Sequence, residues 1–122
     1  MIKLNDIPCT GVRRNALFIE PGSMEVTDLA DVMTRVENWK STGYSATLTS
    51  HGYAMRYAED TDYALIFYRI SGKDDAKLLH MIREEQPNAE IYVQGNDSEL
   101  KMMEPDMKIA KAVAMPYEKE LV

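Results

Sequence analysis

Short apolar runs alternate with amphipathic or polar segments along nearly the whole chain. The apolar runs, rich in branched and aromatic residues, predict strands at 15–20, 44–50, 63–70, 89–94 and 109–115. The segments between and after them predict helices at about 24–42, 53–60, 74–85, 98–104 and 117–122. Strands that alternate with helices of this length indicate a parallel sheet with helices on both faces. The pattern therefore predicts a doubly wound α/β domain whose last helix is short.

The run at 63–70 is the most continuous apolar segment, and it predicts a central strand that is buried on both faces. In an open parallel sheet, ligands and chemistry are found at the carboxyl ends of the strands. Phe67, Tyr68 and Arg69 stand at that end of the predicted strand. This is therefore the first place where we look for a functional site.

Local signals set the limits of the predicted helices. Asp74 and Asp75 fit the N-cap role of the helix at 74–85, because a carboxylate accepts hydrogen bonds from the first free amides. Pro105 is expected to break the helix at 98–104, since proline has no amide hydrogen and clashes with the preceding turn.

Size, charge and cysteine count narrow the class of protein further. The chain has 122 residues and no linker, which predicts one domain at 15–122 preceded by an arm at 1–14. A net charge of −6 argues against direct binding of nucleic acid, which requires a basic face. Without a long apolar run or a signal peptide, and with Cys9 as the single cysteine, we expect a cytoplasmic domain with no membrane span and no internal disulfide.

Several short motifs occur at regular points of this pattern. They are Glu20 at the end of the first strand, Gly43-Tyr44 before the second, the segments 62–72 and 78–83, Pro87, and Ala114-Met115-Pro116-Tyr117 at the end of the fifth. Over about residues 15–121, this order resembles the receiver domain of two-component response regulators. The resemblance implies a five-stranded sheet of order 2-1-3-4-5, the flavodoxin-like or CheY-like fold. The alternative is another doubly wound domain with chance similarity.

The chemistry implied by the resemblance is phosphorylation of an aspartate, but most of its residues are replaced. The family uses an acidic pair that holds Mg²⁺, a phosphoacceptor aspartate, a Thr or Ser, and a Lys before a proline. These positions correspond here to Glu20-Pro21, Phe67 (or Tyr68 after a one-residue shift), Gly95 and Met115, with Pro116 retained. A phenyl ring cannot accept a phosphoryl group, and one carboxylate is too few ligands for a stable Mg²⁺ site. We therefore predict a degenerate receiver that is not an enzyme and has no metal or cofactor.

Such a domain is expected to regulate by binding. The first hypothesis is a signalling module, for example in transcription control, that binds itself or an effector protein through the fourth helix, fifth strand and last helix. The predicted interface residues are Leu100, Met102, Met103, Met107 and Tyr117. Because Met102 and Met103 are adjacent on a helix, only one of them can face the sheet fully, and the other is expected to be exposed.

Two other functions remain open. A small anionic ligand, such as a nucleotide, would bind in a crevice at the strand ends, where an aromatic pair and one cation are available. The residues that line this crevice are Glu20, Phe67, Tyr68, Arg69 and Gly95. The other function is residual phosphoryl transfer at low efficiency. His51 and His80 are too far apart in sequence to give a metal-ligand spacing.

Overall fold

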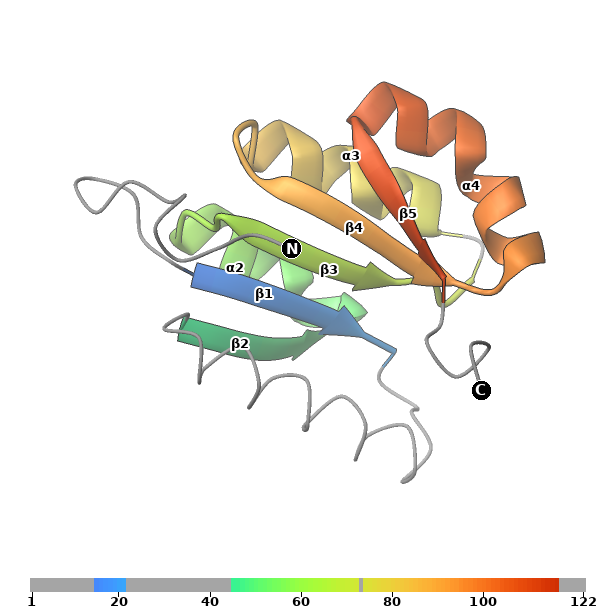
Figure 1. The fold of residues 1–122 in the computed structure, drawn as a ribbon. Helices are drawn as coiled ribbons and strands as arrows, with labels where there is room; N and C mark the ends of the chain where they lie inside the picture. The colour runs from blue at the N-terminus through green and yellow to red at the C-terminus, as the bar shows by residue number, and fades with distance from the viewer. Residues whose placement is uncertain (1–14, 22–44, 73, 117–122) are drawn as a thin grey trace.

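Five parallel strands form one sheet in the computed structural model, which describes residues 15–21, 45–72 and 74–116. The strands are β1 (Asn15–Glu20), β2 (Ser45–Ser50), β3 (Leu65–Arg69), β4 (Glu90–Gly95) and β5 (Ala112–Pro116). Their order is β2-β1-β3-β4-β5, which confirms the predicted fold class (Figure 1). The predictions for the arm at 1–14, the helix at 24–42 and the last helix at 117–122 lie outside the described residues.

Three described helices pack on the same face of the sheet (Figure 1). They are α2 (Ala54–Asp60), which follows the short 3-10 segment η2 (His51–Tyr53), α3 (Asp75–Glu85) and α4 (Asp97–Ala110). Leu79 and Ile82 of α3 lie three residues apart and are fully buried against the sheet, as the helical period requires. None of the helices in the described part of the chain is long and apolar enough to cross a membrane.

The strands divide their side chains between two apolar clusters. In β3, Ile66 and Tyr68 join the cluster under the helices, whereas Leu65 and Phe67 join a second cluster on the opposite face. This division follows from the alternation of side chains along an extended strand. Because four of the five β3 side chains are buried, β3 is the central strand that its composition predicts.

The predicted boundary between the fourth helix and the fifth strand is wrong. Pro105 lies inside α4, which continues to Ala110, and β5 begins at Ala112 rather than at Ile109. Four residues at helical spacing on both sides of the proline are buried: Leu100, Met103, Met107 and Ala110. Burial of this continuous stripe outweighs the single backbone hydrogen bond that Pro105 cannot donate.

Candidate functional site at the strand ends

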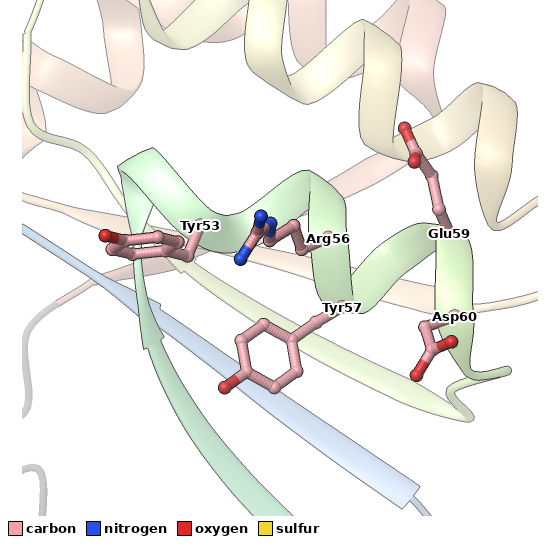
Figure 2. Close-up of a pocket in the computed structure, with 5 residues that line it drawn as sticks. All are labelled: Tyr53, Arg56, Tyr57, Glu59 and Asp60. Carbon is pink, nitrogen blue, oxygen red and sulfur yellow. The ribbon is translucent and has the colours of Figure 1, made fainter.

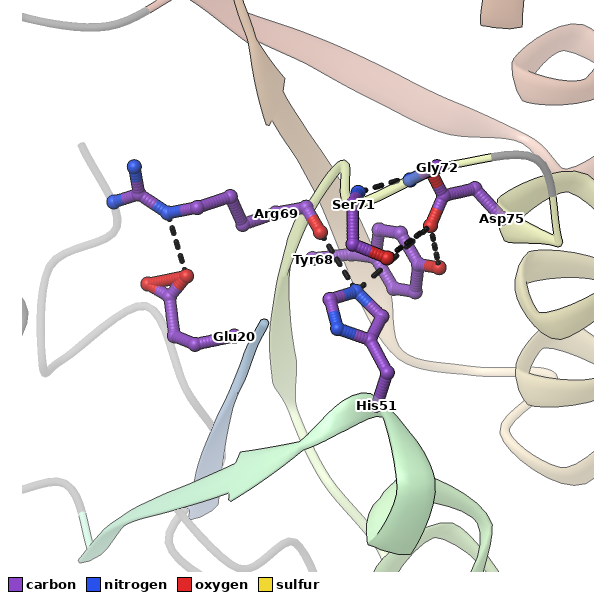
Figure 3. Close-up of polar contacts among 7 residues, drawn as sticks. All are labelled: Glu20, His51, Tyr68, Arg69, Ser71, Gly72 and Asp75. Carbon is purple, nitrogen blue, oxygen red and sulfur yellow. Dashed lines mark hydrogen bonds and ion pairs between the residues drawn. The ribbon is translucent and has the colours of Figure 1, made fainter. Parts of the chain in front are cut away.

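The carboxyl ends of β1 and β3 are joined by an ion pair. Arg69 Nε donates a 2.6 Å hydrogen bond to Glu20 Oε2, and only 14% and 4% of the two side chains are exposed. A charged hydrogen bond of this kind satisfies both groups where little water reaches them. The one carboxylate that the resemblance retains at this edge is therefore already neutralised by a cation of the same chain (Figure 3).

Phe67 lies in the middle of an aromatic stack that crosses three strands. Its ring is stacked on Phe18 of β1 at 4.8 Å between centroids and on Tyr92 of β4 at 5.5 Å. The stack follows directly from the register, since Phe18 pairs with Phe67 and Phe67 pairs with Tyr92. Only 5% of Phe67 is exposed, so this position is an apolar part of the core.

Gly95, Pro21 and Met115 complete the set of positions taken from the resemblance. A Cβ on Gly95 would lie 2.9 Å from Ile70 Cδ1 and 3.2 Å from Glu99 Cβ, so other side chains already fill the space beside it. Met115 is half-buried and packs against the cluster that contains Phe67, and Pro21 is also half-buried. These positions are therefore filled by close packing, whereas the resemblance implies polar side chains there.

A buried polar cluster lies on the other face of β3. The fully buried Tyr68 donates a 2.5 Å hydrogen bond to Asp75 Oδ1, while Asp75 Oδ2 accepts from the backbone amides of Ser71 at 2.9 Å and Gly72 at 2.7 Å (Figure 3). The predicted N-cap role of Asp75 is wrong, because its carboxylate binds the turn that precedes α3 instead. Asp74 occupies the N-cap position, but its side chain makes no capping hydrogen bond.

His51 extends this cluster to the start of η2. Its Nε2 donates a 2.8 Å hydrogen bond to the Arg69 carbonyl oxygen and lies 3.8 Å from Asp75 Oδ1. The imidazole meets the Tyr68 ring edge-on at 4.9 Å, and its buried Nδ1 has no hydrogen-bond partner. One side chain from η2, one from β3 and one from α3 are thus held together beneath the strand ends.

The electrostatics of the cluster favour a fixed structural role. Burial raises the pKa of the Tyr68 hydroxyl far above its usual value, and the hydrogen bond to Asp75 acts in the same direction. The phenol therefore stays protonated and donates to Asp75 throughout the neutral range. Among the described residues, no group of three or more His, Cys, Asp or Glu side chains is placed to hold a metal ion.

The cluster of Tyr68, Asp75 and His51 was not predicted from the sequence, although the positions of Tyr68 and Asp75 could have indicated their contact. Alternation along β3 places Tyr68 opposite Phe67, and Asp75 stands in the first turn of the following helix. The approach of His51 depends on how η2 packs, which no local pattern encodes.

A hollow of about 820 Å³ beside α2 was not predicted either (Figure 2). Its lining residues are Tyr53, Arg56, Tyr57, Glu59 and Asp60. Tyr53 and Tyr57 are 59% and 40% exposed, and the Arg56 guanidinium carbon lies 5.9 Å from the Tyr53 ring centroid. Tyr57 belongs to α2, and Tyr53 is the last residue of η2, directly before that helix.

The predicted interface residues fall into three groups. Met102 is 81% exposed, as expected for one of the two adjacent methionines. Leu100, Met103 and Met107 are buried in the core, so their side chains are not available to a partner. Tyr117 lies outside the described residues. Two further exposed apolar residues were missed: Ile109 was assigned to a strand but lies on α4, and Val113 lies on β5, which is an edge strand.

Comparison with known proteins relates the chain to others by fold alone. No family model matches the sequence, and no curated protein matches it. A solved structure of an adenylate cyclase from Rhodopirellula baltica is similar with a TM-score of 0.67 and 9% identity, over 90% of this chain and 82% of that one. A receiver domain protein from Methanospirillum hungatei, described as CheY-like, has a TM-score of 0.63 and 13% identity, over 90% and 88% of the two chains.

A response regulator from Burkholderia pseudomallei, solved with a phosphorylated aspartic acid, a calcium ion and citrate, has a TM-score of 0.60 and 20% identity. The match covers 88% of this chain and 62% of that one. Together with the strand order, these similarities show that the chain has the fold of response-regulator receiver domains.

Proposed function

We propose that this chain is a cytoplasmic signalling module that regulates by binding another protein chain and takes no phosphoryl group at its strand ends. The observation that carries the proposal is the burial of Phe67 in the stack with Phe18 and Tyr92, at the position where the receiver family has its phosphoacceptor. An aromatic ring has no oxygen nucleophile. The ion pair between Arg69 and Glu20 supports the same proposal, because a guanidinium sits against the carboxylate that would otherwise bind Mg²⁺.

An exposed apolar surface supports the binding part of the proposal. Met102 and Ile109 of α4 are 81% and 71% exposed and lie seven residues apart, so they project from one side of the helix. Exposed apolar side chains on one side of an element are typical of protein-binding surfaces. This region coincides with the surface that the resemblance implies for partner binding.

The phosphorylation half of the proposal is tested with acetyl phosphate and Mg²⁺, followed by intact mass measurement. We expect no added phosphoryl group under conditions that label a phosphorylatable receiver domain in the same tube. If a phosphoryl group is added, peptide mapping identifies the acceptor, and labelling of any aspartate at the strand ends contradicts the proposal.

The binding half is tested by photo-cross-linking in cells. A photoreactive amino acid replaces Met102 in one variant and Met81, which is 40% exposed on α3, in a matched control. We expect a discrete cross-linked protein species from position 102 and none from position 81. Absence of any species from position 102, or equal species from both positions, would count against this surface.

A small-ligand function is the second candidate. At the strand ends, Glu20 neutralises Arg69 and weakens the attraction for an anion. The hollow beside α2 instead offers two exposed tyrosines and Arg56, and because Glu59 and Asp60 also line it, a planar ligand would be held there by stacking rather than by charge. A thermal-shift assay with ATP distinguishes binding at the strand ends from binding in the hollow. Stabilisation lost in Arg56→Ala and kept in Arg69→Ala, each measured against its own melting temperature, assigns the ligand to the hollow. No stabilisation of the parent protein contradicts this candidate.

A further inference from the structure

The hollow beside α2 combines aromatic rings with an excess of negative charge. Its lining includes two exposed tyrosine rings, one cation, Arg56, and two carboxylates, those of Glu59 and Asp60 (Figure 2). The whole chain is also acidic, with a net charge of −6. An anion that enters the hollow therefore meets net repulsion, whereas a cation meets net attraction.

The two carboxylates of the lining are not neutralised by any residue that the structure describes. Glu59 and Asp60 are exposed on α2, and neither side chain makes a hydrogen bond or an ion pair within the described ranges. Arg56 precedes them by three and four residues, a spacing at which ion pairs form on a helix. Its guanidinium carbon instead lies 5.9 Å from the centroid of the Tyr53 ring. The charge of both carboxylates is thus available to a cation from solution.

The contact between Arg56 and Tyr53 indicates which kind of cation suits this surface. A guanidinium is planar and weakly hydrated, so it leaves water for an aromatic face more readily than an ammonium does, and its forked donors match a carboxylate. Tyr57 provides a second ring that is 40% exposed. It lies three residues before Asp60, so the ring and the carboxylate are neighbours on the surface of α2.

We propose that the hollow beside α2 is a binding site for a guanidinium group, which stacks on the Tyr57 ring and pairs with the Asp60 carboxylate, while Glu59 adds attraction at longer range. The group is supplied either by a free guanidinium compound or by an arginine side chain of another protein. The inference rests on the small-ligand function proposed for the hollow and specifies a ligand of positive charge. Because the site is exposed, we expect a dissociation constant on the order of 1 mM.

The test is a titration of the full chain with N-acetyl-arginine amide, followed through the backbone amide resonances of residues 53–60. We expect shifts that saturate. The citrulline analogue has nearly the same shape but no charge, and it should bind at least about threefold more weakly. The lysine analogue should also bind more weakly, because its ammonium is strongly hydrated. Agmatine represents a free guanidinium compound, and the tighter of agmatine and the arginine amide identifies the source of the group.

Substitutions locate the contacts. Asp60→Asn should weaken binding at least about threefold, whereas Asp74→Asn, the same change at an exposed position just before α3, should not. Tyr57→Phe keeps the ring and should keep the affinity, and Tyr57→Leu should lose most of it. Arg56→Ala should strengthen binding, because it removes a like charge and uncovers the Tyr53 ring. Circular dichroism melts check that each variant is folded.

Three results would overturn the inference. They are the absence of saturable shifts, equal affinity for the arginine and citrulline compounds, and weaker binding in Arg56→Ala. Stabilisation by ATP that is lost in Arg56→Ala, without binding of the arginine amide, would overturn this inference and leave the hollow as an anion site. Cross-linking at position 102 concerns a different surface, so its failure contradicts the proposed protein binding and leaves this inference standing.

Discussion

The Tyr68 hydroxyl lies 2.5 Å from Asp75 Oδ1, and this hydrogen bond joins the end of β3 to the first turn of α3 beneath the strand ends. Tyr68 is fully buried and Asp75 is 2% exposed, so neither group has water as an alternative partner. Because the other carboxylate oxygen accepts from two backbone amides, Asp75 fixes both a side chain and the turn that follows the central strand.

Asp75→Ala is expected to lower the free energy of unfolding by about 2–4 kcal/mol, because it leaves the buried Tyr68 hydroxyl and the turn amides without their acceptor. Denaturation with urea measures the change. Asp74→Ala is the matched control, since that side chain is exposed and makes no capping hydrogen bond. Equal effects of the two substitutions would contradict the role given to Asp75.

Alkaline pH is expected to destabilise the domain through its buried tyrosines. Burial raises the pKa of Tyr68 and of Tyr63 above the usual value near 10. The stability that these groups contribute is complete below about pH 10 and is lost as the pH rises towards their folded-state pKa values. Tyr68→Phe should flatten the alkaline loss of stability, and an unchanged slope in that variant would contradict the assignment.

Much of the fold could be predicted from the sequence because each strand is a distinct apolar run. Continuous apolar runs identified the five strands, and their alternation with helices implied a parallel sheet. The fourth helix was predicted to end at Pro105 because proline usually breaks helices, and the helical spacing of apolar residues beyond the proline was given less weight. Leu100, Met103, Met107 and Ala110 keep helical spacing across the proline, and the energy of burying that stripe decided the outcome.

The candidate site was predicted only in part. The positions of its residues along the strands could be inferred from the sequence, but the contacts between residues that are distant in sequence could not. Phe67 and Glu20 were located because position along a strand fixes which edge of the sheet they reach. The bond between Arg69 and Glu20 and the approach of His51 to Tyr68 join residues that are distant in sequence. Such contacts are set by tertiary packing, which local patterns do not encode.

Introducing a hydroxyl residue at position 95 is expected to destabilise the protein. Gly95→Thr places a Cβ 2.9 Å from Ile70 Cδ1 and 3.2 Å from the Glu99 side chain, so Ile70 and the start of α4 must shift. Overpacking of this kind costs about 1–3 kcal/mol. Gly52→Ala is the control, because its Cβ would have only Ser50 Oγ near it, at 3.9 Å. Thermal or urea unfolding that shows no loss for Gly95→Thr would mean that the space is not tight.

Arg83 is expected to be a main stabiliser of the α3–α4 side. Its guanidinium donates to the carbonyl oxygens of Gln86 at 2.9 Å, Ala89 at 2.8 Å and Ala110 at 2.5 Å, and it reaches those of Pro87 and Lys111 at 3.2 Å. Arg83→Met should lower the free energy of unfolding by about 2–4 kcal/mol, because buried carbonyl groups lose their donors.

Arg83→Lys is expected to rescue little of that loss, since a single ammonium cannot reproduce the planar fork of donors. Comparing the stability of Arg83→Met with that of Arg83→Lys separates the effect of losing the charge from the effect of losing the donor geometry. Urea midpoints for the two variants measure it, and full stability in Arg83→Lys would show that charge alone suffices.

Lys111 ends α4 in a left-handed conformation with φ of 55°, and it is the single non-glycine residue with positive φ among those described. Glycine adopts this conformation without the contact between Cβ and the carbonyl oxygen that strains other residues. Lys111→Gly is therefore expected to raise the free energy of unfolding by about 1 kcal/mol. The carbonyl oxygen that accepts from Arg83 is kept in this variant.

Lys108→Gly removes the same side chain from the last turn of α4, where the backbone is helical, and it should lower stability by about 1 kcal/mol. Opposite signs for the two substitutions in urea denaturation would tie the gain at position 111 to backbone conformation rather than to loss of a positive charge. If both variants are stabilised, relief of charge repulsion at the end of the helix would account for the gain instead.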